Sequence, residues 1–242
     1  MANLLIEIGN TAVKASWSDE MTLGKTFRYQ GEKAINFILS LVEKEKPEVM
    51  VVASVYEISQ KDLVRLQSGC NHVLILDNAH TQTLEDHNLP SFLTYDRAAS
   101  LIAAKYLFTG SPCCVLDLGT TLTIDFIDNK GNYSGGNISL GCRTRFKALN
   151  RYSKALALVD TPESPALIGH SVISSIESGV ISGIMFEIEG YISLHPENIV
   201  VFTGGDAIYF AKKMKTPIFV VCNLVLMGLA LIADNYVQKN LR

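Results

Sequence analysis

The hydrophobic pattern of the first half predicts alternating strands and helices. Apolar and polar residues alternate over two short runs separated by a Gly-Asn-Thr break, and longer stretches with helical spacing follow. A valine-rich run is typical of a strand buried on both faces. The predicted order is strands over 3–8, 12–17 and 26–29, a helix over 32–43, a strand over 48–55, a helix over 60–67, a strand over 72–77, and an alanine-rich helix from residue 96 onward.

The second half restarts the same pattern 110 residues later. Its predicted elements are strands over 113–118 and 121–127, a third strand opening YSGGNISLG, helices over 144–156 and 171–191, a buried strand in NIVVFTGGDA, and an apolar helix over 220–233. A supersecondary unit that recurs at a fixed offset indicates a duplication. We expect an α/β fold of two domains, 1–110 and 111–242, with mixed sheets and a nucleotide cleft between them.

Composition narrows the class of protein. Apolar residues make up 48% and charged residues 19% of the 242, with a net charge of -3, which argues against disorder and against a nucleic-acid partner. The run over 220–233 is too short for a membrane span, and the N-terminus lacks a basic region typical of a secretory signal. Five cysteines without a C-x-x-C pair indicate neither a disulfide framework nor zinc. We expect a cytoplasmic protein without membrane partners.

The repeated feature with chemical content is a carboxylate two residues before a glycine. Glu7 precedes Gly9, and Asp117 precedes Gly119, each where one strand ends and the next begins. A single such turn is most simply a tight hairpin. However, a hairpin needs no carboxylate at a buried strand end, where an unpaired charge is costly, and both copies have one. Glycine turns let backbone N–H groups approach a phosphate, and the acid can hold a cation beside it.

Four segments in register, EIGNTAVK, LDLGTTLTID, GGNISLG and TGGDA, resemble the type III pantothenate kinases of the actin-like ATPase and sugar kinase superfamily. The resemblance implies ATP-dependent phosphorylation of pantothenate to 4'-phosphopantothenate, the first step of coenzyme A synthesis. It also implies Mg²⁺ with ATP, a monovalent cation (K⁺ or NH4⁺) on Asp117, and a homodimer with the substrate site at the interface. The implied ATP-binding residues are Glu7, Ile8, Gly9, Asn10, Thr11, Ala12, Val13, Lys14, Gly119, Thr120, Gly204 and Gly205.

The segment TYDRAAS resembles the family's substrate loop, which implies that Asp96 is the general base and that Arg97 binds substrate. From the residues alone, an aspartate just before an alanine-rich helix is most often an N-cap, and the two roles are compatible. Gly179 and Gly183 have a spacing that permits close helix packing, as at a dimer interface. The implied substrate-binding residues are His87, Thr94, Tyr95, Asp96, Arg97 and Val172.

Two alternatives stay open at this point. Glu7, Thr94, His87 and Val172 depart from the family's usual residues, which would suit a catalytically weakened relative that acts as a regulatory or binding protein. A sugar kinase of the same superfamily is less favoured because the chain has no room for the usual sugar-domain insertions.

Overall fold

The computed structural model describes residues 2–77 and 82–241, which form two compact units. The first unit contains residues 1–107 and 223–242, and the second contains residues 108–222. The expected second domain, 111–242, differs from this division because the C-terminal helix packs with the first unit. That helix, α8 (Leu224–Asn240), contacts β1 (Ala2–Ile8), β4 (Val49–Ser54) and α4 (Tyr95–Leu107).

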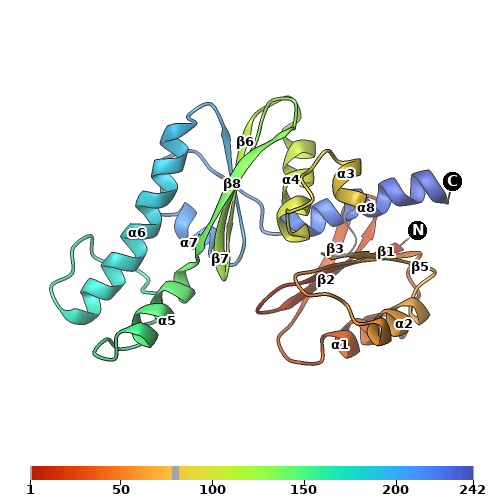
Figure 1. Cartoon of the computed structure of the whole chain (residues 1–242), viewed down its shortest axis with the longest axis horizontal. Coiled ribbons are helices and arrows are strands. Elements are labelled where there is room, and N and C mark those ends of the chain that lie inside the picture. The colour runs from red at the N-terminus through yellow and green to blue at the C-terminus, as the bar shows by residue number, and fades with distance from the viewer. Residues whose placement is uncertain (1, 78–81, 242) are drawn as a thin grey trace. The chain divides into compact units, whose positions relative to one another are not determined.

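The first unit is a five-stranded mixed sheet with helices on both faces (Figure 1). The strand order is β3-β2-β1-β4-β5, with β2 and β3 antiparallel to their neighbours and β4 and β5 parallel. Its elements are β1 (Ala2–Ile8), β2 (Val13–Asp19), β3 (Thr22–Tyr29), α1 (Ala34–Leu41), β4 (Val49–Ser54), α2 (Gln60–Ser68), β5 (His72–Leu76), α3 (Gln82–Asp86), α4 (Tyr95–Leu107) and α8 (Leu224–Asn240).

The period of two along β1 decides which helices cover which face. Leu4, Ile6 and Ile8 pack against Ile38 of α1 and Leu66 of α2 in one core. The alternate positions of β1, which include Glu7, therefore face the other side of the sheet, where α8 and α4 lie. The first phosphate-loop candidate and the helix that begins near Asp96 thus share one face.

The second unit repeats this architecture. Its strand order is β10-β9-β6-β7-β8, which matches the first sheet when that sheet is read from β5 to β3. The central strand β6 is antiparallel to β7 and parallel to β9, as β1 is antiparallel to β2 and parallel to β4. Helices α5, α6 and α7 supply Phe146, Ile184 and Phe210 to the core on one face. The elements are β6 (Cys113–Leu118), β7 (Thr121–Ile127), β8 (Tyr133–Leu140), α5 (Cys142–Tyr152), α6 (Val172–Leu194), β9 (Ile199–Thr203), α7 (Ala207–Ala211) and β10 (Phe219–Val220).

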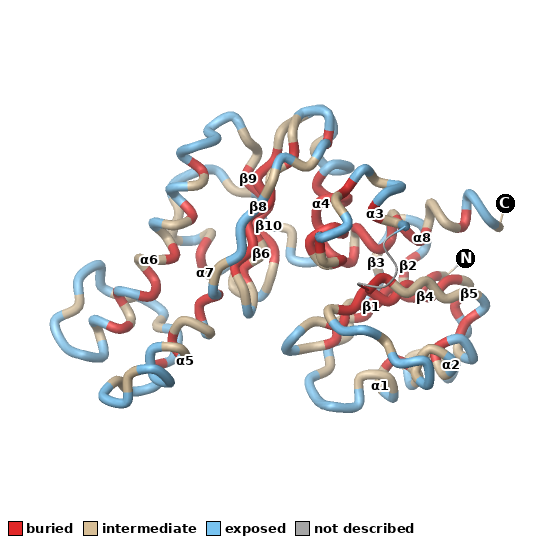
Figure 2. The backbone as a smooth tube through the Cα atoms, viewed as in Figure 1, coloured by how far each residue is buried: buried red, intermediate tan, exposed pale blue. Residues whose placement is uncertain are grey.

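The duplicated α/β fold predicted from the sequence is confirmed. Buried residues concentrate on the inner strands β1, β4, β6 and β9 and on α4 (Figure 2). Three short elements, α3, α7 and β10, were not predicted because two to five residues carry no periodic signal. The helix expected over 220–233 begins at Leu224 and continues to Asn240, and Val220 lies in β10 instead. No helix within the described part of the chain is both long and apolar enough to cross a bilayer.

Candidate active site

The first candidate phosphate loop is the hairpin between β1 and β2. Residues 7–8 end β1, residues 9–12 form the turn, and residues 13–14 begin β2. The Gly9 N–H donates to the Ala12 carbonyl at 3.0 Å and closes the turn. The Tyr56 hydroxyl donates to Asn10 Oδ1 at 3.1 Å and so ties the turn to the segment after β4. The loop is therefore a closed hairpin with an additional anchor.

Glu7 forms an ion pair with Lys14, the residue directly opposite it on β2. The Lys14 Nζ atom donates to Glu7 Oε1 at 3.2 Å and to Oε2 at 3.1 Å. Burial raises the pKa of Glu7 above its ordinary value, while the Lys14 charge and hydrogen bond lower it and the Asp96 charge raises it. Glu7 thus contacts one cation, Lys14, and is within electrostatic reach of a second acid, Asp96.

Asp96 lies in the first turn of α4, where a negative charge is favoured by the helix dipole. Its Oδ1 accepts the Arg97 N–H at 2.9 Å. The first bond of the helix runs from the Ala98 N–H to the Thr94 carbonyl at 2.9 Å, so Thr94 rather than Asp96 is the flanking cap residue. The N-cap interpretation of Asp96 is therefore wrong by two positions, and the Asp96 carboxylate is only half-buried.

The neighbours of Asp96 are more enclosed. Tyr95 is buried, and burial followed by the Asp77 charge raises its pKa to about 12. The Arg97 side chain is only 8% exposed. Within residues 2–77 and 82–241, the only non-glycine residues with positive φ are Glu20 and Asn88. Thr94 therefore adopts an ordinary backbone conformation.

His87 belongs to the first unit and Val172 to the second. His87 follows α3, and burial lowers its pKa, while the charge of Asp86 raises it and those of Lys105 and Lys239 lower it. Lys105 lies near the carboxyl end of α4, nine residues beyond Asp96, or about 13 Å along the helix. Because the Lys105 charge acts on His87, His87 lies nearer to the carboxyl end of α4 than to Asp96 at its amino end. Val172 is the first residue of α6 in the second unit and is 60% exposed.

The second candidate phosphate loop repeats the first. Asp117 stands one residue before the end of β6, as Glu7 does in β1, and the Gly119 N–H donates to the Thr121 carbonyl at 3.0 Å. The Thr120 carbonyl accepts the Gly141 N–H at 3.1 Å and the Thr144 hydroxyl at 2.6 Å. The loop is thereby held against the amino end of α5.

Gly204 brings the segment after β9 against this loop. Asp117 pairs with Thr203 across the parallel strands β6 and β9, and Gly204 follows with φ +91°. A Cβ at Gly204 would overlap the Asp117 carboxylate and lie 2.6 Å from the Leu118 carbonyl oxygen. Gly205, in contrast, is exposed, and a Cβ there would meet no atom within 4 Å. Only glycine fits the first of these two positions.

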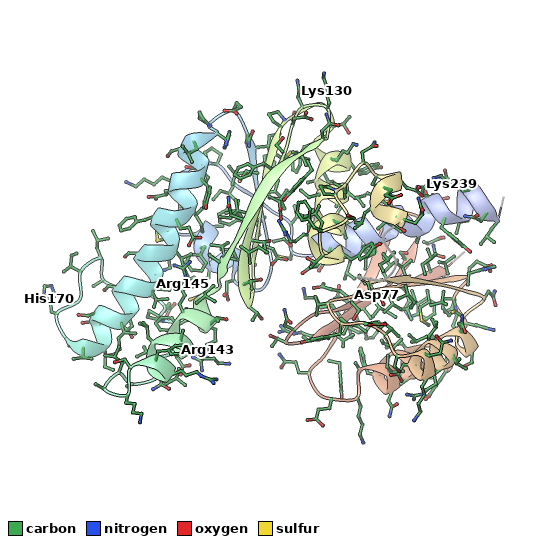
Figure 3. The ribbon with its side chains drawn as sticks, in the orientation of Figure 1. Asp77, Lys130, Arg143, Arg145, His170 and Lys239 are labelled. Carbon is green, nitrogen blue, oxygen red and sulfur yellow. The ribbon has the colours of Figure 1, made fainter. Side chains whose placement is uncertain are left out.

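An apolar groove runs between α5 and α6 of the second unit. Its volume is about 940 Å³, and its lining includes Leu140, Leu149, Tyr152, Val172, Ile176 and Gly179. Tyr152 is 86% exposed. Arg145 lies on the α5 side of the groove (Figure 3) and donates to the Leu140 carbonyl at 2.8 Å and to Glu187 of α6. An apolar surface of this kind on a folded unit indicates an interaction site.

Sequence reasoning missed three residues of this site. Tyr56, which anchors the first loop, and Thr144, which anchors the second, carry no motif of their own. Arg28 lies opposite Lys14 on β3, and its charge acts on Glu7. Strand register brings Arg28 to the first loop, whereas Tyr56 and Thr144 reach the loops through side-chain hydrogen bonds from the segment after β4 and from α5. Among the described residues, no group of three or more His, Cys, Asp and Glu side chains is arranged to hold a metal ion.

Comparison with known proteins agrees with this geometry. Residues 3–194 match the model of the family described as type III pantothenate kinase. A type III pantothenate kinase from Cytophaga hutchinsonii is 38% identical over 234 residues, which cover 94% of this chain and 96% of the relative. A second one, from Bacteroides fragilis, is 35% identical over 233 residues, which cover 94% of this chain and 95% of the relative.

Among solved structures, the ROK hexokinase from Thermus thermophilus is similar with a TM-score of 0.54 at 13% identity, over 96% of this chain and 98% of that one. This likeness supports the actin-like ATPase and sugar kinase fold. The two glycine loops with their carboxylates, the helix that begins beside Asp96 and the match over most of the sequence converge, and the chain belongs to the type III pantothenate kinase family.

Proposed function

We propose that this chain is an ATP-dependent kinase that phosphorylates the primary hydroxyl of pantothenate, giving 4'-phosphopantothenate for coenzyme A synthesis. The observation that carries the proposal is the grouping, within one unit, of the Glu7–Lys14 ion pair with Asp96, whose charge acts on Glu7. Transfer of a phosphoryl group to a hydroxyl requires a cation that contacts the phosphates and a base that orients the hydroxyl, and Lys14 and Asp96 would fill these two roles.

Asp96 is the proposed base. The substrate hydroxyl oxygen forms a bond to the terminal phosphorus of ATP, the bond from that phosphorus to the bridging oxygen breaks, and the hydroxyl proton passes to Asp96. Because the transition state is loose, the carboxylate mainly orients the hydroxyl and takes the proton late. The Arg97 N–H donates to Asp96 Oδ1 and so holds the carboxylate in place for that role.

The loops fit the phosphates of ATP. Both turns are closed hairpins whose glycines leave the backbone accessible, and Gly204 permits a close approach to Asp117 that no other residue would allow. The proposed ATP-binding set is residues 7–14 with Gly119, Thr120, Gly204 and Gly205. A divalent cation bound with ATP would neutralise phosphate charge.

Three finer points complete the proposal. Asp117 would hold a monovalent cation, K⁺ or NH4⁺, beside the second loop. Thr94, Tyr95 and Arg97 would surround the substrate near Asp96. The apolar groove between α5 and α6, with Val172 at its edge, would bind the same groove of a second copy, so that the enzyme is a homodimer.

The experiment is a coupled ADP-release assay with pantothenate and a panel of hexoses, each with and without K⁺. Asp96→Asn should lower turnover by about 10²–10⁴-fold while ATP binding, measured by calorimetry, is retained. Asp62→Asn is the matched control because Asp62 is also an acid in the first turn of a helix, α2. Unchanged turnover in Asp96→Asn would remove the base assignment, and a silent wild type with every acceptor would favour a regulatory role.

A further inference from the structure

A row of charged side chains crosses three strands of the first sheet at one level. Glu7 is directly opposite Lys14, and Lys14 is directly opposite Arg28. Residues opposite each other on antiparallel strands point to the same face, with Cα atoms about 5 Å apart. The three side chains therefore lie side by side on the face that carries α4.

The charges in this row do not cancel. Both carboxylate oxygens of Glu7 accept from Lys14, so one negative charge matches one positive charge. Arg28 is exposed and makes no hydrogen bond or ion pair with the residues that the structure describes. Like charges directly opposite each other on a sheet repel. Asp96 brings a second negative charge to Glu7, but Lys14 and Arg28 remain like charges opposite each other beside the first candidate phosphate loop, and an anion bound between these two cations would relieve their repulsion.

We propose that Arg28 binds the phosphate chain of the nucleotide together with Lys14. The inference rests on the proposed function, since it assigns a further residue to the same nucleotide site. A guanidinium offers a planar pair of N–H donors that matches two phosphate oxygens, whereas Lys14 already gives part of its donor capacity to Glu7. Glu7 partly neutralises the charge of Lys14, and Arg28 supplies a second positive charge for the phosphates.

The test compares Arg28→Gln, Arg28→Lys and the control Lys25→Gln. Lys25 is on the same strand, but its ammonium lies 5.8 Å from the centre of the Phe27 ring, and Lys25 and Phe27 occupy positions that alternate with Arg28. Both glutamine variants thus lose one positive charge from exposed positions of β3, on opposite faces. Circular dichroism and thermal unfolding would verify that all three fold.

Calorimetry with ATP, ADP and adenosine gives the readout. We expect Arg28→Gln to weaken ATP binding about tenfold at low salt, with adenosine affinity unchanged, and Arg28→Lys to lie between Arg28→Gln and wild type because it keeps the charge but loses the fork. The difference should shrink as salt is raised. Lys25→Gln should bind ATP as wild type does.

Two results would overturn the inference. One is an ATP affinity of Arg28→Gln equal to that of Lys25→Gln. The other is an Arg28→Gln variant whose KM rises for pantothenate alone, since that would assign the guanidinium to the substrate carboxylate. Failure of the proposed function has a different signature, namely a wild-type chain that binds ATP without phosphorylating pantothenate, and the binding comparison still decides the role of Arg28.

Discussion

Replacing Gly204 with alanine tests the close approach between the segment after β9 and the second candidate phosphate loop. The added Cβ would overlap the Asp117 carboxylate and lie 2.6 Å from the backbone oxygen of Leu118, and φ at Gly204 is +91°. A left-handed conformation costs an alanine about 1–2 kcal/mol, and overpacking against backbone costs about 1–3 kcal/mol. We therefore expect a loss of about 2–5 kcal/mol in the free energy of unfolding of the second unit.

The neighbouring residue supplies the control. Gly205→Ala adds the same methyl group where no atom lies within 4 Å, and Gly205 has no positive φ. Urea unfolding of both variants, followed by circular dichroism, measures the difference. The same variants would be compared in ATP affinity, because a shift of about 1 Å in Asp117 can cost about 10²-fold in rate or binding. A Gly204→Ala protein within about 0.5 kcal/mol of Gly205→Ala would refute the reasoning.

Two further predictions concern Glu7 and the α5/α6 groove. Burial raises the pKa of Glu7 above 4.5, so the contribution of Glu7 to stability is full below that pH and is lost as the pH rises through the folded-state pKa. Over that range the free energy of unfolding of wild type, measured with urea, should therefore fall relative to that of Glu7→Gln. Parallel pH curves for the two proteins would contradict this. In sedimentation experiments, Tyr152→Asp should convert the dimer to monomers because Tyr152 lines the groove. Phe186→Asp should not, because Phe186 is 62% exposed on α6 but lies outside the groove lining. Equal effects of the two variants would argue against the groove as the interface.

The two glycine turns that form the candidate phosphate loops could be predicted from the sequence because their signals are local. A carboxylate, a glycine turn and flanking alternation lie within eight residues, and the second copy removed most of the ambiguity of the first. The position of Asp96 near a helix start followed from the alanine-rich run for the same reason. The error of two residues at its cap is typical of helix boundaries, where several residues can flank the first turn.

Arg28 could not be predicted because its place depends on register. The pairing of β2 with β3 shifts between Ser16 and Ser18, so the residue that faces Lys14 cannot be counted from the turn between the strands. The partner of the C-terminal helix was missed for a different reason. Its residues are apolar on nearly every side, so the pattern indicates burial without indicating which unit supplies the neighbours.

The return of α8 to the first unit has a consequence for the order of folding during synthesis. A Cβ at Gly228 would overlap the backbone of Ala99, so α8 and α4 pack against each other at a distance that only glycine permits. The second unit is continuous from residue 108 to residue 222 and is complete before α8 is translated. Domains of a nascent chain usually fold from the N-terminus onward. Here the first unit cannot be completed until α8 has been translated, so the second unit can fold first.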